Sequence, residues 1–245
     1  MAAFDCDRWA VLERAAAGGV AAIVVPGIAA TGWAGLLQIC AQDCRLYPAL
    51  GIHPLVMPQH EASDFKHLEK LITQARPIAI GEIGLDASVG DVARQQPGLE
   101  RQLALACAAD LPVLLHVRKA HEPMLACLSR LPRINGIVHA FNGSLEQAKR
   151  YLDLGFKLGF GGMLTYPRST RLRRLAAALP DTSLVLETDA PDMTGAAHCR
   201  QRNSPEYLPE VLTTLAQIRT LAPDTLAAIT TANAQSVLNL DVPLH

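Results

Sequence analysis

The sequence predicts an α/β fold, a (β/α)8 barrel of the TIM type that lacks one of its eight strands. Short apolar runs alternate with helical patterns along the whole chain of 245 residues. Each strand and its helix occupy roughly thirty residues, which is the spacing of an eightfold barrel. The apolar runs show no polar alternation, which indicates parallel strands covered on both faces. We expect one domain over residues 1–245.

Composition limits the compartment and the partners. Lysine and arginine number 22 against 23 acidic residues, so the net charge of −1 gives no general attraction for nucleic acid or acidic membranes. A signal peptide and a membrane span are not expected, because Pro26 and Gly27 interrupt the apolar run 20–30. The six cysteines form no paired CxxC motifs and are typical of reduced thiols. These features predict a cytoplasmic protein without a membrane partner.

The elements follow in order. Asp7 is expected to cap an opening helix over 8–17 that ends at Gly18 and Gly19. Strands are predicted at 21–25, 46–52, 78–86, 112–116, 136–139, 156–162 and 183–189. Helices are predicted between them at 31–43, 63–74, 92–109, 120–129, 144–153 and 169–178. Two final helices, 205–222 and 223–238, each open with a proline suited to a first turn.

This count gives seven strands, and the eighth would precede Arg8. Only seven residues lie there, and they contain no apolar run. A seven-stranded barrel leaves two unpaired strand edges, which is unfavourable. We therefore expect the natural reading frame to extend upstream of Met1 far enough to encode the missing strand. An in-frame stop codon directly upstream would contradict this expectation.

The apolar stretch 78–86 carries a carboxylate, Glu82, in its middle. Burial of an isolated carboxylate is costly, so Glu82 should be protonated, paired with a cation or bound to metal. A structural ion pair with Arg118 remains an alternative to metal binding.

Later apolar runs also end in residues that can bind metal. His116, His139 and Asp189 each close one of them. Because the carboxyl ends of barrel strands meet at one face, these residues should converge with Glu82. Imidazoles with carboxylates fit zinc, manganese, iron or, less well, magnesium. A solitary histidine at a strand end is more often a hydrogen-bonded core residue, but the combination favours metal.

Five motifs together resemble the TatD-like metal-dependent deoxyribonucleases, which belong to the amidohydrolase-type barrels. The motifs cover essentially the whole chain in the family's order and spacing, and lie at 51–54, 81–86, 115–118, 138–143 and 187–192. The family's first strand ends in a His-x-His pair of metal ligands. This chain has no such pair, and the gap coincides with the missing strand.

The resemblance implies that Glu82 bridges two divalent metal ions, Mg, Mn or Zn. His116 and His139 would complete one metal site. Asp189 and the absent His-x-His pair would complete the other, so this chain could hold only one ion. Asp189 would also accept a proton from the attacking water. Glu82, Asp189 and His53 are the expected catalytic residues.

Substrate contacts are expected around the same face. His53 would hydrogen-bond a phosphate oxygen, and Arg118 could bind phosphate through two hydrogen bonds. Asn203 resembles the start of the family's Asn-x-Pro segment and should also contact substrate. A nucleic-acid backbone could follow a group of arginines, or the group could form a solvated helix face: Arg168, Arg171, Arg173 and Arg174.

Two further carboxylates have alternative interpretations. Asp86 could support a metal ligand or serve as a helix-cap or loop residue. Glu187 could support the metal site or a hydrogen-bond network in the core.

The resemblance implies a divalent-metal-dependent hydrolase, a deoxyribonuclease that acts as a 3′–5′ exonuclease on single-stranded DNA. One alternative is an amidohydrolase-type enzyme with another ester or amide substrate, since related barrels host many chemistries. Another is a non-catalytic remnant that has lost its first-strand ligands. The partner would be DNA or another phosphodiester, and the sequence does not indicate an oligomeric state.

Overall fold

Seven parallel strands form a single sheet in the computed structural model, which describes residues 2–131 and 133–240. The strands are β1 (Ile23–Gly27), β2 (Leu46–Leu50), β3 (Ala79–Asp86), β4 (Val113–Arg118), β5 (Gly136–Val138), β6 (Phe156–Phe160) and β7 (Leu184–Leu186). They lie side by side in the order of the sequence. The predicted fold class and the predicted number of strands are confirmed within these residues.

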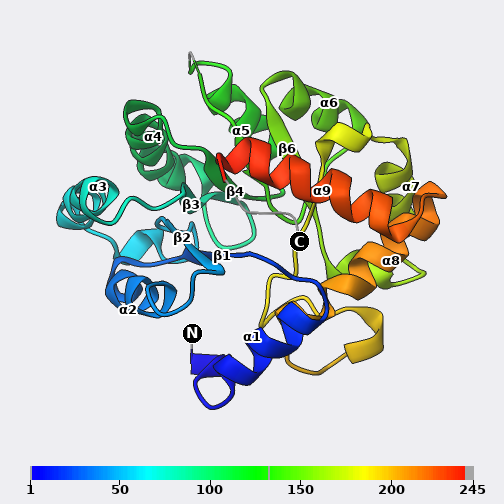
Figure 1. The fold of residues 1–245 in the computed structure, drawn as a ribbon. Coiled ribbons are helices and arrows are strands. Elements are labelled where there is room, and N and C mark those ends of the chain that lie inside the picture. The colour runs from blue at the N-terminus through cyan, green and yellow to red at the C-terminus, as the bar shows by residue number, and fades with distance from the viewer. Residues whose placement is uncertain (1, 132, 241–245) are drawn as a thin grey trace.

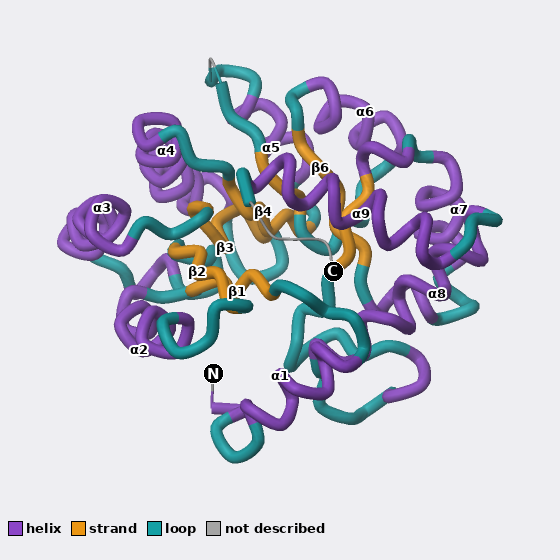
Figure 2. The backbone as a smooth tube through the Cα atoms, in the orientation of Figure 1, coloured by secondary structure: helices purple, strands orange, loops and turns teal. Residues whose placement is uncertain are grey.

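Helices surround the curled sheet (Figure 1). They are α1 (Arg8–Ala17), α2 (Ala30–Cys40), α3 (Ala62–Ala75), α4 (Val92–Ala109), α5 (His121–Leu128), α6 (Leu145–Asp153), α7 (Thr170–Ala178), α8 (Leu208–Arg219) and α9 (Pro223–Leu238). Figure 2 shows the strands gathered inside and most of the helices outside. The loops after the carboxyl ends of the strands therefore share one face of the molecule.

The sheet is a curled half-barrel. In the described part of the chain, β1 pairs with β2 from Ile23 to Gly27, and β7 pairs with β6. No pairing joins β1 to β7, so both are edge strands, as the strand count predicted. Strand β1 ends at Gly27, two residues beyond its predicted end, and therefore includes Pro26. An edge strand tolerates a proline because one side of it needs no N–H donor.

Several other boundaries differ from the prediction, among them the end of β2, which lies at Leu50 and not at Ile52. The last strand ends at Leu186 and not at Asp189, because Asp189 has a φ of 61° and has left the extended conformation. The strand predicted to reach Gly162 ends at Phe160. The helix predicted from Pro205 starts at Leu208, since residues 205–207 form a 3-10 turn.

The inner face of the sheet is closed at one end by the last helix. Val237 and Leu238 of α9 cluster with small and aliphatic residues of β2, β3 and β4, namely Ala49, Ala79 and Leu114. Asn233 of α9 also donates to the carbonyls of Asp181 and Leu184, at 2.7 and 2.8 Å. The helix thereby covers an interior that seven strands leave open.

Two buried glutamines of α4 hold the ends of neighbouring strands. Gln95 accepts a hydrogen bond from the Asp86 amide and donates to the Asp86 carbonyl, both at 2.8 Å. Gln102 makes the same pair of contacts with Ile52, at 2.7 and 3.2 Å. The two lie seven residues apart, which places them on one face of the helix. Helix α4 thus fixes the chain at the end of β3 and just before His53.

We expect Gln102→Leu to lower the free energy of unfolding by about 2–4 kcal/mol, because the buried N–H and C=O of Ile52 would lose their partners. Urea denaturation would measure this loss. The control is Gln96→Leu, since the side-chain hydrogen bond found for Gln96 among the described residues is to Glu100 on the same helix. Equal effects of the two substitutions would contradict the assigned role of Gln102.

Candidate metal centre

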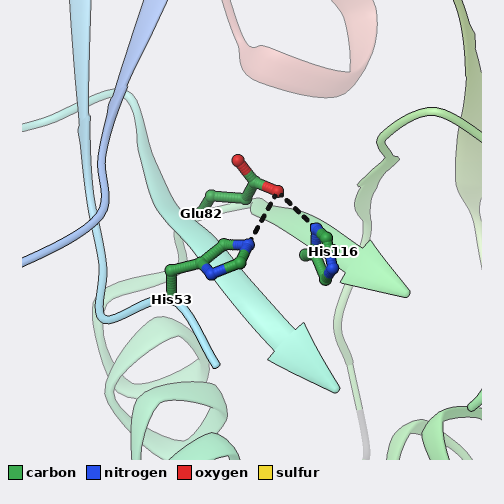
Figure 3. A group of neighbouring side chains, drawn as sticks. All are labelled: His53, Glu82 and His116. Carbon is green, nitrogen blue, oxygen red and sulfur yellow. Dashed lines mark hydrogen bonds and ion pairs between the residues drawn. The ribbon is translucent and has the colours of Figure 1, made fainter. Parts of the chain in front are cut away.

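Glu82 is buried in the middle of β3, with 8% of its surface exposed. Its Oε1 lies 3.0 Å from His116 Nδ1 and 3.5 Å from His53 Nε2 (Figure 3). His53 follows β2 and His116 lies in β4, so three neighbouring strands supply this group. Arg118 is exposed at the end of β4. Among the described residues, the ion pairs found for Glu82 are with His53 and His116. The alternative expectation, an ion pair between Glu82 and Arg118, is therefore not observed.

A second group lies around His139, directly after β5. Its Nδ1 is 2.8 Å from Glu187 Oε2, and its Nε2 is 3.5 Å from Asp189 Oδ2. Glu187 is held in turn, because its Oε1 accepts a hydrogen bond from the Ala140 amide at 2.9 Å. Both Glu187 and Asp189 follow β7.

The two groups share Glu82. Their candidate ligands are His53, Glu82 and His116 in one group and Glu82, His139 and Asp189 in the other. Within each group the ligand atoms lie within 4.8 Å of one another. The structure therefore brings together the four residues predicted to bind metal, although it groups His116 with His53 and not with His139.

Without metal, the carboxylates around His116 and His139 favour the protonated form of both rings. His116 Nδ1 faces Glu82, and its Nε2 lies 3.1 Å from Asp86 Oδ2. Carboxylates only accept, so both ring nitrogens hold a proton. Burial alone would lower the pKa of His116, but Glu82 and Asp86 outweigh it and raise that pKa. Burial also opposes the charge of His139, whose pKa Glu187, Asp189 and Glu82 raise well above the usual value.

The same contacts keep Glu82 ionised. Burial alone would raise its pKa, but hydrogen bonds from His116 and His53 lower it far below the usual value. A buried carboxylate is thus compensated by neighbouring imidazoles, an arrangement in which a metal ion could replace protons.

The donor set fits a divalent metal. With metal on one ring nitrogen, His116 would retain a hydrogen bond to Asp86, and His139 would retain one to Glu187. Metal-binding histidines typically donate their other N–H to a carboxylate, which orients the ring. Asp86 is itself fixed by the amide and hydroxyl of Ser88, at 2.7 and 2.5 Å. Both alternatives are observed for each residue: Asp86 and Glu187 each contact a candidate ligand, and each also accepts a hydrogen bond from a neighbouring backbone amide.

His53 differs from the other two histidines. Its Nδ1 accepts a hydrogen bond from the Leu55 amide at 3.0 Å. The neutral ring must then carry its proton on Nε2, the nitrogen that faces Glu82. Metal on Nε2 would shift the ring proton to Nδ1 and break the hydrogen bond from the Leu55 amide, so this geometry favours His53 as a hydrogen-bond donor, the role expected from the sequence.

Asn203 has an internal role. It is 2% exposed, and its amide nitrogen donates to the carbonyls of Thr188 and Asp192, both at 2.6 Å. These two bonds use both of its N–H groups, so in this structure the side chain holds the loop that carries Asp189. The substrate contact expected from the sequence stays a prediction.

Part of the group of arginines at 168–174 holds the backbone of neighbouring loops. Arg171 donates to the carbonyls of Asn142 and Gly143, and Arg173 donates to the Leu164 carbonyl at 2.9 Å. Arg168 lies over the Tyr166 ring, 5.3 Å from its centroid. Two of the four arginines therefore stabilise loops.

Sequence reasoning missed the contribution of Gln95 and Gln102. Both are buried on α4, among Leu99, Leu103 and Ala106. The available signal was a polar residue repeated after seven positions on an otherwise apolar helix face. Such a pattern identifies buried amides, but it does not reveal which strand ends they bind.

Comparisons with known proteins agree with this geometry. The sequence profile described as TatD related DNase matches residues 1–239. An uncharacterized metal-dependent hydrolase of Escherichia coli K12, YjjV, is 41% identical, with 97% of this chain and 93% of the relative covered. The 3′-5′ ssDNA/RNA exonuclease TatD of Salmonella typhimurium is 32% identical, with 97% and 95% covered.

Solved structures show the same fold. The crystal structure of Escherichia coli YjjV superimposes with a TM-score of 0.91 at 40% identity, covering 97% of this chain and 93% of that one. An organophosphorus hydrolase mutant from Deinococcus radiodurans has a TM-score of 0.64 at 15% identity, covering 92% and 81%, and shares the fold alone. None of the described helices is both long and apolar enough to cross a membrane. This chain belongs to the TatD related DNase family and is a metal-dependent hydrolase.

Proposed function

We propose that the protein is a nuclease that removes nucleotides from the 3′ end of single-stranded DNA or RNA. The observation that carries the proposal is the pair of histidine and carboxylate groups joined by the buried Glu82. The relative from Salmonella typhimurium, named a 3′-5′ ssDNA/RNA exonuclease, supports this choice of substrate.

Four residues would hold one or two divalent ions, Mg, Mn or Zn: Glu82, His116, His139 and Asp189. When bound, such ions generate a nucleophile from water at neutral pH and offset the charge on a phosphate under attack. Asp86 and Glu187 would keep the two imidazole rings in the orientation that presents a free nitrogen.

The protein's own groups suggest how a phosphodiester is handled. The Asp189 side chain is 33% exposed, against 10% for Glu82, so it is the more accessible acceptor for a proton from water. With Glu82 bound to metal, the Nε2–H of His53 would be free to form a hydrogen bond with a phosphate oxygen. Arg118, exposed at the end of β4, would bind a second phosphate oxygen or a neighbouring phosphate.

Glu82→Gln should abolish metal-dependent cleavage, with a loss of at least about 100-fold, because the shared carboxylate would be replaced by a neutral amide. The assay would follow 5′-labelled single-stranded DNA and RNA in manganese buffer. A ladder that shortens from the 3′ end is the expected product of the wild type.

The matched control is Arg150→Gln, which removes an exposed ion pair with Glu122 and should leave cleavage unchanged. Full cleavage by Glu82→Gln would rule out the mechanism. Hydrolysis of lactones or amides without cleavage of DNA or RNA would rule out the proposed substrate.

Metal binding should release protons. The raised pKa values of His116 and His139 mean that these rings keep their protons to higher pH than an ordinary histidine, whose pKa is about 6.5. A metal ion must displace them, so manganese affinity should rise with pH until the pH passes these raised pKa values. Calorimetry in buffers of different ionisation enthalpy would count the protons. Affinity independent of pH would contradict this prediction.

A further inference from the structure

The loop between β7 and α8 holds Asp189 in an unusual backbone conformation. Its φ of 61° lies in the left-handed region, which residues other than glycine seldom adopt. The Asp192 amide donates to the Asp189 carbonyl at 2.9 Å and closes a tight turn. Such conformations persist where surrounding contacts hold them. The direction of the Asp189 carboxylate therefore depends on what fixes this turn.

Asn203 fixes the turn from both sides. Its side chain binds the carbonyls of Thr188 and Asp192, which flank Asp189 in the sequence. Its backbone amide donates to the Pro191 carbonyl at 2.9 Å. Three hydrogen bonds from one buried residue thus span the turn, and the position of Asn203 determines the position of Asp189.

The preceding residue, Arg202, connects this segment to the amino-terminal region. Its guanidinium donates to both carboxylate oxygens of Asp7, at 2.8 and 2.6 Å. It also binds the Ala3 carbonyl and lies 4.5 Å from the centroid of the Phe4 ring. Planar two-point contacts of this kind fix direction as well as distance.

The contact explains why Asp7 departs from its predicted role. Asp7 precedes α1, as a helix cap should, but it makes no capping hydrogen bond. Arg202 instead binds its side chain and lowers its pKa. A second ion pair, Arg14 with Glu206, joins α1 to the turn that follows Asn203. Figure 1 shows α1 beside this loop.

We propose that Arg202 is a positioning residue for Asp189. The Asp7–Arg202 pair anchors Asn203, and Asn203 holds the turn that directs the Asp189 carboxylate toward His139. This inference rests on the proposed role of Asp189 as a metal ligand. Asp7, in the amino-terminal segment, would thereby influence the orientation of Asp189, which lies much later in the chain.

Hydrogen exchange of the metal-free protein tests the anchor without requiring metal. In Arg202→Gln, amides of the segment 188–192 should exchange at least about fivefold faster, because the turn opens more often. Arg150→Gln, which breaks an exposed ion pair between α5 and α6, should leave this segment unchanged. The double variant Asp7→Arg with Arg202→Asp, in which the two charges are swapped, should return to slow exchange. The single variant Arg202→Lys should exchange at an intermediate rate, because lysine keeps the charge but not the two-point contact.

Manganese affinity tests the consequence. Arg202→Gln should bind manganese about three- to tenfold more weakly, in line with the loss of a partner that orients a ligand. Unchanged exchange at 188–192 would overturn the inference, and so would faster exchange with unchanged affinity. Equally faster exchange in every peptide, with a lower Tm, would show a merely structural role and would also overturn it.

The two proposals can fail separately. If the wild type fails to bind manganese, the metal-dependent function is wrong. The exchange comparison would still decide whether Arg202 fixes the turn at Asp189.

Discussion

The structure depends on the negative charge of Glu82 in the middle of a buried strand. All eight residues of β3 are buried, so this carboxylate has little access to water. It remains ionised because imidazoles from the two neighbouring strands donate to it. The requirement for hydrogen-bond donors explains why an imidazole follows β2 and another lies in β4.

The partners of Glu82 are compensated in turn. His116 lies between Glu82 and Asp86, and His139 lies between Glu187 and Asp189. Without metal, protons on the imidazoles offset part of the negative charge of the carboxylates. With metal bound, protons on the ligating nitrogens would be displaced, and Asp86 and Glu187 would still orient the rings. One set of residues would therefore serve both states.

Residues outside the strands that carry the candidate ligands hold the candidate metal centre in place. Helix α4 holds the backbone before His53 and at Asp86 through two buried glutamines. The loop after β7 is held by Asn203, and Arg202 joins that loop to the amino-terminal segment. Gln95, Gln102 and Asn203 use side-chain amides to bind backbone groups, which fixes direction without adding charge.

Much of the fold was predictable because hydrophobic periodicity is a local property. The bounds of α1 and α4 match the prediction, and the order of strands and helices follows from the chain itself. The ends of β6 and β7 were placed too late, since departure from the extended conformation depends on contacts with other segments. Convergence of Glu82, His116, His139 and Asp189 was predictable from the common direction of parallel strands.

The sequence by itself thus determined the element order, the number of strands and the residue types at the metal centre. Only the tertiary structure decided which partner each polar side chain takes. Asp7 binds Arg202 and not its own helix, Asn203 faces the backbone, and the Leu55 amide fixes the proton of His53. The reason is physical: strands and helices are encoded over a few neighbouring residues, whereas a hydrogen bond depends on distances and angles between segments far apart in the chain.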